Sequence, residues 1–272
     1  MSIPLVSGAW LLEHHLDPNV HVVDARFVLG NPDAGREAFA SGHIPGAVFA
    51  DLERDLSDHP PPDRRGGRHP LPAIAKLEKS LSKLGISNEQ HVVAYDGGGF
   101  FAAHFWWMLR YLGHDEVSVL DGGLPSWTGP LETVVRQYSG NFHAKPRTEM
   151  LVDAHYVRNR GTGSVLIDSR APERFRGDVE PIDWKAGHIP GAINKDWANG
   201  LENGHFKSSE AQLERFKDVR NATEVIVYCG SGVSAGANML TLELAGIHGA
   251  KLYAGSWSDW VSDDARPIAT GG

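Results

Sequence analysis

The sequence of 272 residues predicts an α/β protein with two tandem domains, each a mainly parallel sheet flanked by helices. Short apolar segments alternate with stretches of helical periodicity along the chain. This alternation is typical of parallel sheets that are covered on both faces. The second half also repeats the motifs of the first half in the same order, which indicates an internal duplication.

The elements of the first half follow one another in an alternating order. The expected series is a short helix over 5–16, a strand over 21–26, a turn at 42–48, a helix over 73–84, a strand over 91–96, a helix over 102–112 and a strand over 117–120. Residues 57–72 are rich in proline, glycine, arginine and aspartate, which predicts an irregular loop.

Four segments of the second half match segments of the first. Gly187–Ala192 repeats Gly42–Ala47 residue for residue. The other matches join Val22–Arg26 to Val165–Arg170, Val92–Asp96 to Val225–Cys229, and Asp121–Trp127 to Ala254–Trp260. The join between the repeats contains Gly140, Asn141 and Pro146, so we expect a first domain over 1–140, a linker over 141–149 and a second domain over 150–272.

Cys229 is the only cysteine of the chain. It follows the strand predicted over 225–228, and a small-residue loop leads from it to a helix over 237–244. The first N–H groups of a helix lack partners and carry the positive end of its dipole, so this loop is predicted to bind anions. A thiol at the mouth of such a cup should ionise readily and act as a nucleophile. The alternative is a buried structural cysteine.

Asp96 occupies the position of Cys229 in the first half. A carboxylate there would repel an anionic substrate, and it cannot act as a sulfur nucleophile. The first half is therefore predicted to be a catalytically silent copy.

Composition excludes several classes of function. The net charge of −8 argues against a surface for nucleic acid or for an anionic membrane. One cysteine cannot form an internal disulfide, and neither a signal peptide nor an apolar run of about 20 residues is present. The histidines show no ligand spacing, so no metal and no cofactor is expected. These features favour a cytoplasmic protein.

The motifs together resemble those of the rhodanese family of tandem-domain sulfurtransferases. The landmarks are Asp168-Ser169-Arg170, Gly187–Ala192, the loop that begins at Cys229 and the closing segment Gly255–Trp260. The resemblance implies a silent first domain and a catalytic cysteine in the second. It implies that Cys229 takes sulfur from a small anionic donor as a persulfide and passes it to thioredoxin, another thiol or cyanide.

The loop residues point to the branch of the family that acts on 3-mercaptopyruvate. The sequence Cys229-Gly230-Ser231-Gly232-Val233 resembles that branch, and Ser234 stands where a threonine is usual. The resemblance implies that the substrate is bound by Gly230, Gly232, Val233, Ser234 and, through its carboxylate, Arg174. Arginine suits this task because its planar fork binds a carboxylate through two hydrogen bonds.

A Ser-His-Asp relay for protons is a further implication of the resemblance. Ser231 would supply the hydroxyl. His69, in the irregular loop over 57–72, would supply the imidazole. The acid would be Asp55 or Asp58. This relay would place part of the site on the first domain.

One position departs from the family pattern. Members that act on mercaptopyruvate usually carry a second arginine shortly after the Glu-Pro of this segment, and here Ile182 follows Glu180-Pro181. Arg176 and Lys185 are nearby cations that could replace it. The departure leaves thiosulfate as the alternative donor.

Two other functions have a specific sequence test. A cysteine phosphatase needs an arginine near the end of the loop, where this chain has Ala235 and Gly236. A non-catalytic module that binds anions or a partner would carry Cys229 without forming a persulfide. The structure and the chemistry of Cys229 distinguish these hypotheses.

Overall fold

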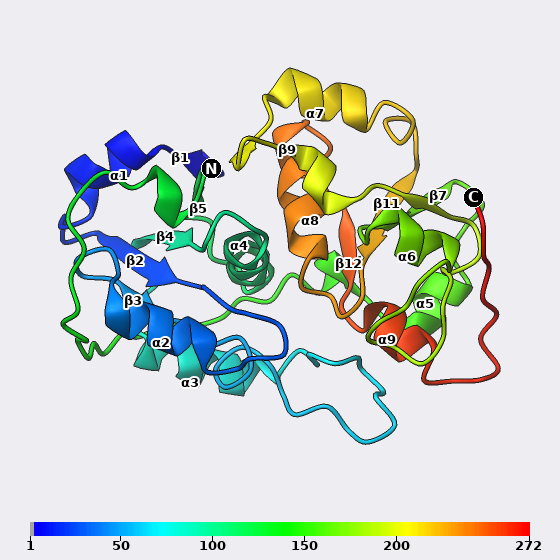
Figure 1. Ribbon diagram of the computed structural model, residues 1–272, viewed down its shortest axis with the longest axis horizontal. Helices are drawn as coiled ribbons and strands as arrows, with labels where there is room; N and C mark the ends of the chain where they lie inside the picture. The colour runs from blue at the N-terminus through cyan, green and yellow to red at the C-terminus, as the bar shows by residue number, and fades with distance from the viewer. Residues whose placement is uncertain (1–2) are drawn as a thin grey trace. The chain divides into compact units, whose positions relative to one another are not determined.

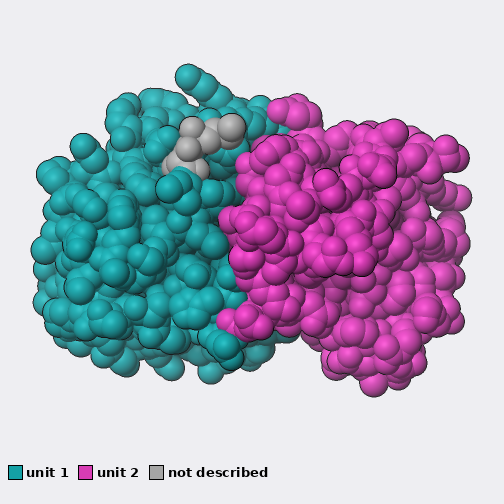
Figure 2. All heavy atoms as spheres, turned by 90° about the horizontal axis from the view of Figure 1, so that it is seen from above, with its two compact units in different colours: residues 1–58, 72–147, 203–206 teal, residues 59–71, 148–202, 207–272 magenta. Residues whose placement is uncertain are grey.

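The computed structural model describes residues 3–272, which form two compact units shown in different colours in Figure 2. The first unit contains the described residues up to 58, together with 72–147 and 203–206. The second contains 59–71, 148–202 and 207–272. The expected domains differ from these units mainly because residues 59–71 have their contacts in the second unit and residues 203–206 in the first.

The first unit is built on a parallel sheet in the order β1-β5-β4-β2-β3 (Figure 1). Its strands are β1 (Leu5–Val6), β2 (Val20–Asp24), β3 (Val48–Phe49), β4 (His91–Tyr95) and β5 (Val117–Leu120), and the short β10 (His205–Phe206) also belongs to it. Its helices are α1 (Gly8–His14), α2 (Ala34–Ser41), α3 (Ile74–Lys83), α4 (Phe101–Tyr111) and the 3₁₀ turn η1 (Leu124–Ser126).

Helices pack on the central strand β4 because its side chains alternate between the two faces of the sheet. Val93 and Tyr95 lie in one buried cluster with Leu11 of α1 and Phe39 of α2. Helix α4 contacts β4 and β5, and its residues Ala102–Leu109 are buried. This arrangement is the covered parallel sheet that the alternation of apolar segments predicts.

The second unit repeats the same topology with its strands in the order β6-β12-β11-β7-β8. Its strands are β6 (Leu151–Val152), β7 (Ser164–Asp168), β8 (Ala192–Asn194), β9 (Leu201–Glu202), β11 (Glu224–Tyr228) and β12 (Lys251–Tyr253). Its helices are η2 (Thr148–Met150), α5 (Ala154–Arg158), α6 (Pro172–Arg176), η3 (Trp197–Gly200), α7 (Ser209–Arg215), α8 (Ala235–Leu244) and α9 (Ser256–Trp260). The predicted α/β fold with two repeated domains is confirmed.

An Asp-x-Arg clamp recurs in both units and explains one of the matched motifs. Arg26 binds Asp24 through Nε and Nη2 and donates to the carbonyl of Gly42 at 2.8 Å. Arg170 binds Asp168 in the same way and donates to the carbonyl of Gly187 at 2.6 Å. Each clamp therefore ties the end of a strand to the start of a Gly-His-Ile-Pro-Gly turn.

The histidines of these turns have the same structural role in both units. His43 stacks on Phe39, and His188 stacks on Phe175, with ring centroids 3.8 Å apart in each case. Each histidine also uses Nδ1 to bond the carbonyl of its stacking partner. Because the same contacts occur in the half that lacks the cysteine, we interpret both histidines as structural residues of the turn.

The opening segment differs from the prediction of a helix over 5–16. Residues 5 and 6 form β1, which pairs with β5 through Leu5↔Val119, and the helix starts only after Ser7. The hydroxyl of Ser7 accepts the N–H of Trp10 at 3.1 Å and so caps α1. A two-residue strand at a sheet edge has no periodicity of its own, so only the tertiary pairing reveals it.

No helix within residues 3–272 is both long enough and apolar enough to cross a membrane.

Candidate active site

Cys229 lies at the carboxyl end of β11, where parallel sheets bind their ligands. Its N–H donates to Oγ of Ser256 at 3.0 Å, and its carbonyl accepts the N–H of Trp257 at 3.0 Å. The sequence predicted a thiol at the open end of an anion-binding loop. In the structure Cys229 is only 1 % exposed, so its thiol is more deeply buried than predicted. The start of α9 covers it, which the sequence pattern did not predict.

The loop after Cys229 offers a row of hydrogen-bond donors. Within residues 3–272, no partner accepts the backbone N–H groups of Gly230, Ser231, Gly232, Val233 or Ser234. Gly232 has φ of +83°, and a Cβ atom there would lie 2.4 Å from the carbonyl oxygen of Ala254. The loop therefore requires glycine at this position and leads directly into α8.

Ser256 supports Cys229 from a strained backbone conformation. It has φ of +55°, which costs a non-glycine residue about 1 kcal/mol. Its buried hydroxyl accepts the N–H of Cys229 and donates to the carbonyl of Tyr253 at 2.9 Å. The matching position in the first half is Gly123, so the serine adds a hydroxyl where the repeat has none. This difference between the repeats was the available signal for a residue that the sequence analysis missed.

Ser231 and His69 meet in the second unit. Nδ1 of His69 lies 3.0 Å from Oγ of Ser231, although the two residues are 162 positions apart in the chain. The segment 59–71 that carries His69 is held to this unit by the N–H of Gly66, which donates to Asp259 at 2.8 Å. Burial and the adjacent positive charge of Arg68 lower the pKa of His69 to about 4, so its imidazole is neutral at physiological pH.

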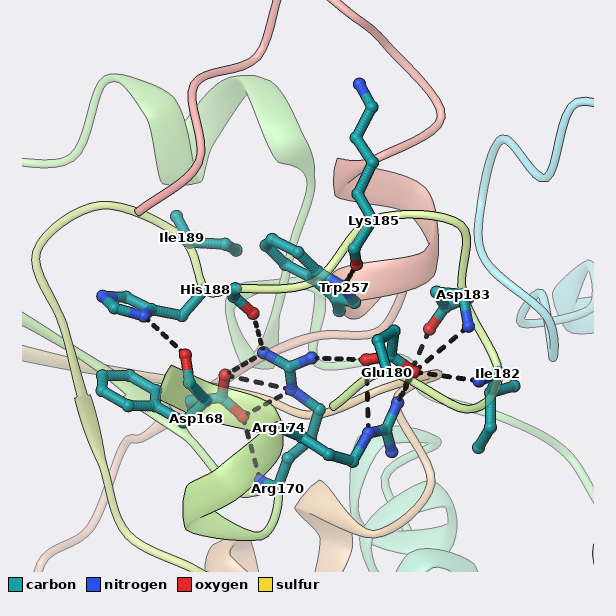
Figure 3. A network of polar contacts seen from close by, with 12 residues as sticks. Asp168, Arg170, Arg174, Glu180, Ile182, Asp183, Lys185, His188, Ile189 and Trp257 are labelled. Carbon is teal, nitrogen blue, oxygen red and sulfur yellow. Dashed lines mark hydrogen bonds and ion pairs between the residues drawn. The ribbon is translucent and has the colours of Figure 1, made fainter. Parts of the chain in front are cut away.

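Arg174 lies on α6, and its guanidinium reaches the cysteine loop. A Cβ atom on Gly230 would lie 3.5 Å from both Nη1 and Nη2 of Arg174. Nη2 donates to Oε1 of Glu180 at 2.6 Å and Nε donates to Oε2 at 3.2 Å (Figure 3). Glu180 also accepts from Arg170 at 3.1 Å, so this buried carboxylate fixes the direction of the Arg174 side chain.

The cations that were candidates for the missing second arginine lie elsewhere. Arg176 pairs with Asp178 at 2.8 Å, and both side chains are exposed. Lys185 points away from the contact between Arg174 and Glu180 (Figure 3) and pairs with Asp264 at 2.5 Å.

Arg68 is a cation at the cysteine loop that the sequence analysis did not single out. Its Nη1 pairs with Asp183, and a Cβ atom on Gly230 would lie 2.8 Å from its Nη2. It directly precedes His69 in the chain, so its place beside the predicted histidine was the available signal.

Asp55 and Asp58, the expected acids of the relay, lie in the first unit, where they have other partners. Oδ2 of Asp55 accepts the N–H of Asp51 at 3.1 Å, and burial raises the pKa of Asp55. Asp58 pairs with Nζ of Lys76 at 2.5 Å. The choice between them stays a prediction.

Within the part of the chain that the structure describes, no group of three or more His, Cys, Asp or Glu side chains could hold a metal ion. The polar groups around Cys229 are thus hydroxyls, an imidazole, arginines and backbone N–H groups. These groups are suited to hold an anion and to move a proton next to a thiol.

Comparison with known proteins gives consistent results for the whole chain. The model of the rhodanese-like domain matches residues 7–130 and 153–263. A relative from Pseudomonas aeruginosa, named as a probable 3-mercaptopyruvate sulfurtransferase, is 43% identical over 284 residues, which cover 99% of each chain. A relative from Mycobacterium tuberculosis, named provisionally as a thiosulfate sulfurtransferase, is 43% identical over 94% of this chain and 92% of its own.

A solved structure agrees with the sequence comparisons. The crystal structure of a 3-mercaptopyruvate sulfotransferase from Escherichia coli matches with a TM-score of 0.83 and 34% identity. The match covers 94% of this chain and 100% of the other. The chain therefore belongs to the rhodanese family, with one rhodanese-like domain in each half.

Proposed function

We propose that this protein is a 3-mercaptopyruvate sulfurtransferase with Cys229 as its nucleophile. The thiolate attacks the sulfur of the donor, and an S–S bond forms as the C–S bond breaks. The electron pair of the broken bond stays on carbon, and the resulting enolate takes up a proton to give pyruvate. An acceptor thiolate or cyanide then attacks the outer sulfur and releases the Cys229 thiolate.

The observation that carries this proposal is the position of Arg174 against the loop of Cys229. Its guanidinium lies beside Gly230, and Glu180 holds it from the other side. A carboxylate bound by Arg174 would lie next to the loop of Cys229. A donor only a few atoms long could then reach from the guanidinium to the thiol. The unpartnered N–H groups of residues 230–234 can hold the persulfide and the developing negative charge.

Ser231 and His69 are proposed to move the proton. Neutral imidazole can accept a proton through the Ser231 hydroxyl when the donor thiol gives it up, and can return it to the carbon of the enolate. The transfer then needs no net proton from water. The third member of the relay, Asp55 or Asp58, stays a prediction of the family resemblance.

The acceptor follows from the chemistry of the persulfide. Its outer sulfur is transferred to a nucleophile, so we propose thioredoxin or another thiol, or cyanide, as acceptor. A reactive cysteine escapes oxidation where the compartment keeps thiols reduced. We therefore propose the cytoplasm as the site of action.

Thiosulfate is the second candidate donor. Ile182 stands where the family usually has the second arginine for a carboxylate, and the relative from Mycobacterium tuberculosis carries the name of that activity. Thiosulfate is an anion without a carboxylate, so a site with one arginine would still bind it.

A donor panel with intact-mass spectrometry tests the proposal. The protein is incubated with 3-mercaptopyruvate or thiosulfate, and its mass is measured together with the release of pyruvate or sulfite. We expect one added sulfur atom and pyruvate with 3-mercaptopyruvate. The added sulfur can only lie on Cys229 as a persulfide, because the chain has no other cysteine.

The matched control is Cys229→Ser, which should show no added sulfur and no turnover. Faster loading from thiosulfate would favour the second candidate. The absence of an adduct with every donor would support a binding module instead of an enzyme.

A further inference from the structure

The guanidinium of Arg68 lies at the cysteine loop and keeps part of its hydrogen-bonding capacity free. Its side chain is 11% exposed, and Nη1 forms an ion pair with Asp183. Within residues 3–272, its buried Nε has no hydrogen-bond partner. A Cβ atom on Gly230 would lie 2.8 Å from its Nη2, which makes no hydrogen bond to the described residues and so remains for a ligand at this loop.

Arg174 faces the same point from the other side. Both of its Nη atoms would lie 3.5 Å from a Cβ atom on Gly230, and its Nη2 lies 3.8 Å from the Asp183 oxygen that binds Arg68. The two guanidinium groups are therefore neighbours. Both lie within ion-pair distance of Asp183, and both lie beside Gly230. Nη1 of Arg174 makes no hydrogen bond to the described residues and adds a donor on this side.

The network around these arginines joins four guanidinium groups to three carboxylates. Its arginines are Arg64, Arg68, Arg170 and Arg174, and its carboxylates are Asp168, Glu180 and Asp183. The unbalanced cation is Arg64, which is 32% exposed, so water screens its charge. Guanidinium nitrogens are donors only, so a substrate carboxylate can accept hydrogen bonds from the free nitrogens of Arg68 and Arg174.

We propose that Arg68 binds the carboxylate of the donor together with Arg174 and replaces the arginine that the family usually has near position 182. Asp183, which directly follows Ile182, is the positioning residue for Arg68, because its carboxylate forms an ion pair with Nη1 of Arg68. This inference rests on the proposed function and names the substrate-binding residues of that site. The chain thus restores a two-arginine site with a cation from residues 59–71, more than 100 positions away.

Arg64 provides an internal contrast on the same segment. Its Nη1 approaches the other oxygen of Asp183 at 3.4 Å, and its guanidinium lies over the ring of Trp184 at 5.4 Å. It is 32% exposed, and no close approach to Gly230 is among the nearest contacts of that glycine. Arg64 therefore shares the acid but not the site, and it is the matched control.

The experiment compares two donors that differ only in the carboxylate. These are 3-mercaptopyruvate and 1-mercapto-2-propanone, in which a methyl group replaces the carboxylate. For Arg68→Met we expect the KM for 3-mercaptopyruvate to rise about ten- to a hundredfold, as befits a lost charge-assisted hydrogen bond. The kcat should change only a fewfold, and kcat/KM for 1-mercapto-2-propanone less than twofold.

Two further variants sharpen the result. Arg174→Met should show the same selective loss, and Arg64→Met should leave the KM for 3-mercaptopyruvate within about twofold. Arg68→Lys keeps the charge but not the planar fork, so we expect a smaller, several-fold rise in KM. This variant also serves if Arg68→Met does not fold.

The outcomes distinguish this inference from the proposed function. A wild-type protein that takes no sulfur from 3-mercaptopyruvate overturns both. An active wild type with an unchanged KM in Arg68→Met, or in Arg68→Lys if only that variant folds, overturns the role of Arg68 alone. Equal losses on both donors also overturn it, because a structural defect does not depend on the carboxylate.

Discussion

The two units differ in the residue that follows the central strand, although they share one fold. In the first unit Asp96 follows β4, and its own carboxylate accepts the N–H groups of Gly98, Gly99 and Ala102 at 2.7, 2.8 and 3.0 Å. In the second unit Cys229 follows β11, and the N–H groups of residues 230–234 have no partner among the described residues. The same position of the fold is closed by a side chain in one repeat and left open in the other.

This difference explains why one copy is predicted to be silent. Asp96 is 3% exposed, so its charge is buried and balanced by three N–H groups of its own loop. Three donors of that loop are therefore already bound to its own carboxylate. In the second unit the donors remain, and the arginines 68 and 174 add positive charge beside Gly230.

The largest effect is expected from Cys229→Asp, which gives the second unit the residue of the first. The new carboxylate should accept the N–H groups of its loop, so sulfur transfer should fall below detection. We expect Tm to exceed that of Cys229→Asn by about 2–4 °C, since charge-assisted hydrogen bonds to a carboxylate are worth about 1 kcal/mol more than neutral ones. Differential scanning calorimetry measures the difference.

Binding of pyruvate distinguishes a loop whose N–H groups are bound by the new carboxylate from a loop that the substitution has only disrupted. Pyruvate should raise the Tm of Cys229→Ser, whose loop is open, but not that of Cys229→Asp. A Cys229→Asp protein that is less stable than Cys229→Asn, or one that pyruvate still stabilises, would contradict the comparison.

A smaller loss of activity is expected from Ser231→Ala, because it removes the hydroxyl that His69 contacts and leaves the thiol in place. We expect kcat with 3-mercaptopyruvate to fall about a hundredfold, the lower end of what positioned proton transfer contributes. Unchanged kcat would mean that Ser231 is only a small loop residue. The measurement is pyruvate release at saturating donor.

The pH dependence of this loss tests the state of His69. Burial and the charge of Arg68 lower its pKa from 6.5 to about 4, so the imidazole stays neutral, and able to accept a proton, throughout the range above pH 5. The ratio of wild-type to Ser231→Ala activity should therefore be constant from about pH 8 to 5.5 and should fall only as pH approaches 4. A midpoint near 6.5 would show that His69 titrates like a solvent-exposed histidine.

The smallest effect on activity is expected from Asp96→Ala in the silent repeat. Three N–H groups, that of Ala102 fully buried, lose their acceptor, so the free energy of unfolding should fall by about 1–3 kcal/mol. The kcat/KM for the donor should stay within twofold. Urea denaturation followed by circular dichroism measures the stability, and Glu89→Ala, at an exposed position, is the control. A large loss of kcat/KM in a folded Asp96→Ala variant would assign this repeat a role in catalysis.

The internal repeat of motifs allowed most of the fold to be predicted from the sequence. Matched motifs such as Gly42–Ala47 and Gly187–Ala192 predicted two copies of one α/β domain, and continuous apolar segments such as Val225–Tyr228 predicted buried parallel strands. These signals are local, because strand and turn preferences depend on neighbouring residues. The position of Cys229 at the end of a central strand followed from them.

The composition of the site was determined by the tertiary structure. Ser256, His69 and Arg68 lie next to the cysteine loop through hydrogen bonds and ion pairs between distant segments, such as Arg68 with Asp183. Residues 59–71 have no periodicity and no core of their own, so the sequence could not show which unit they join. The sequence by itself determined the repeat and the position of Cys229 after a central strand, since these rest on local patterns. The partners around Cys229 depend on charge pairing across more than 100 residues of chain, which only the folded structure reveals.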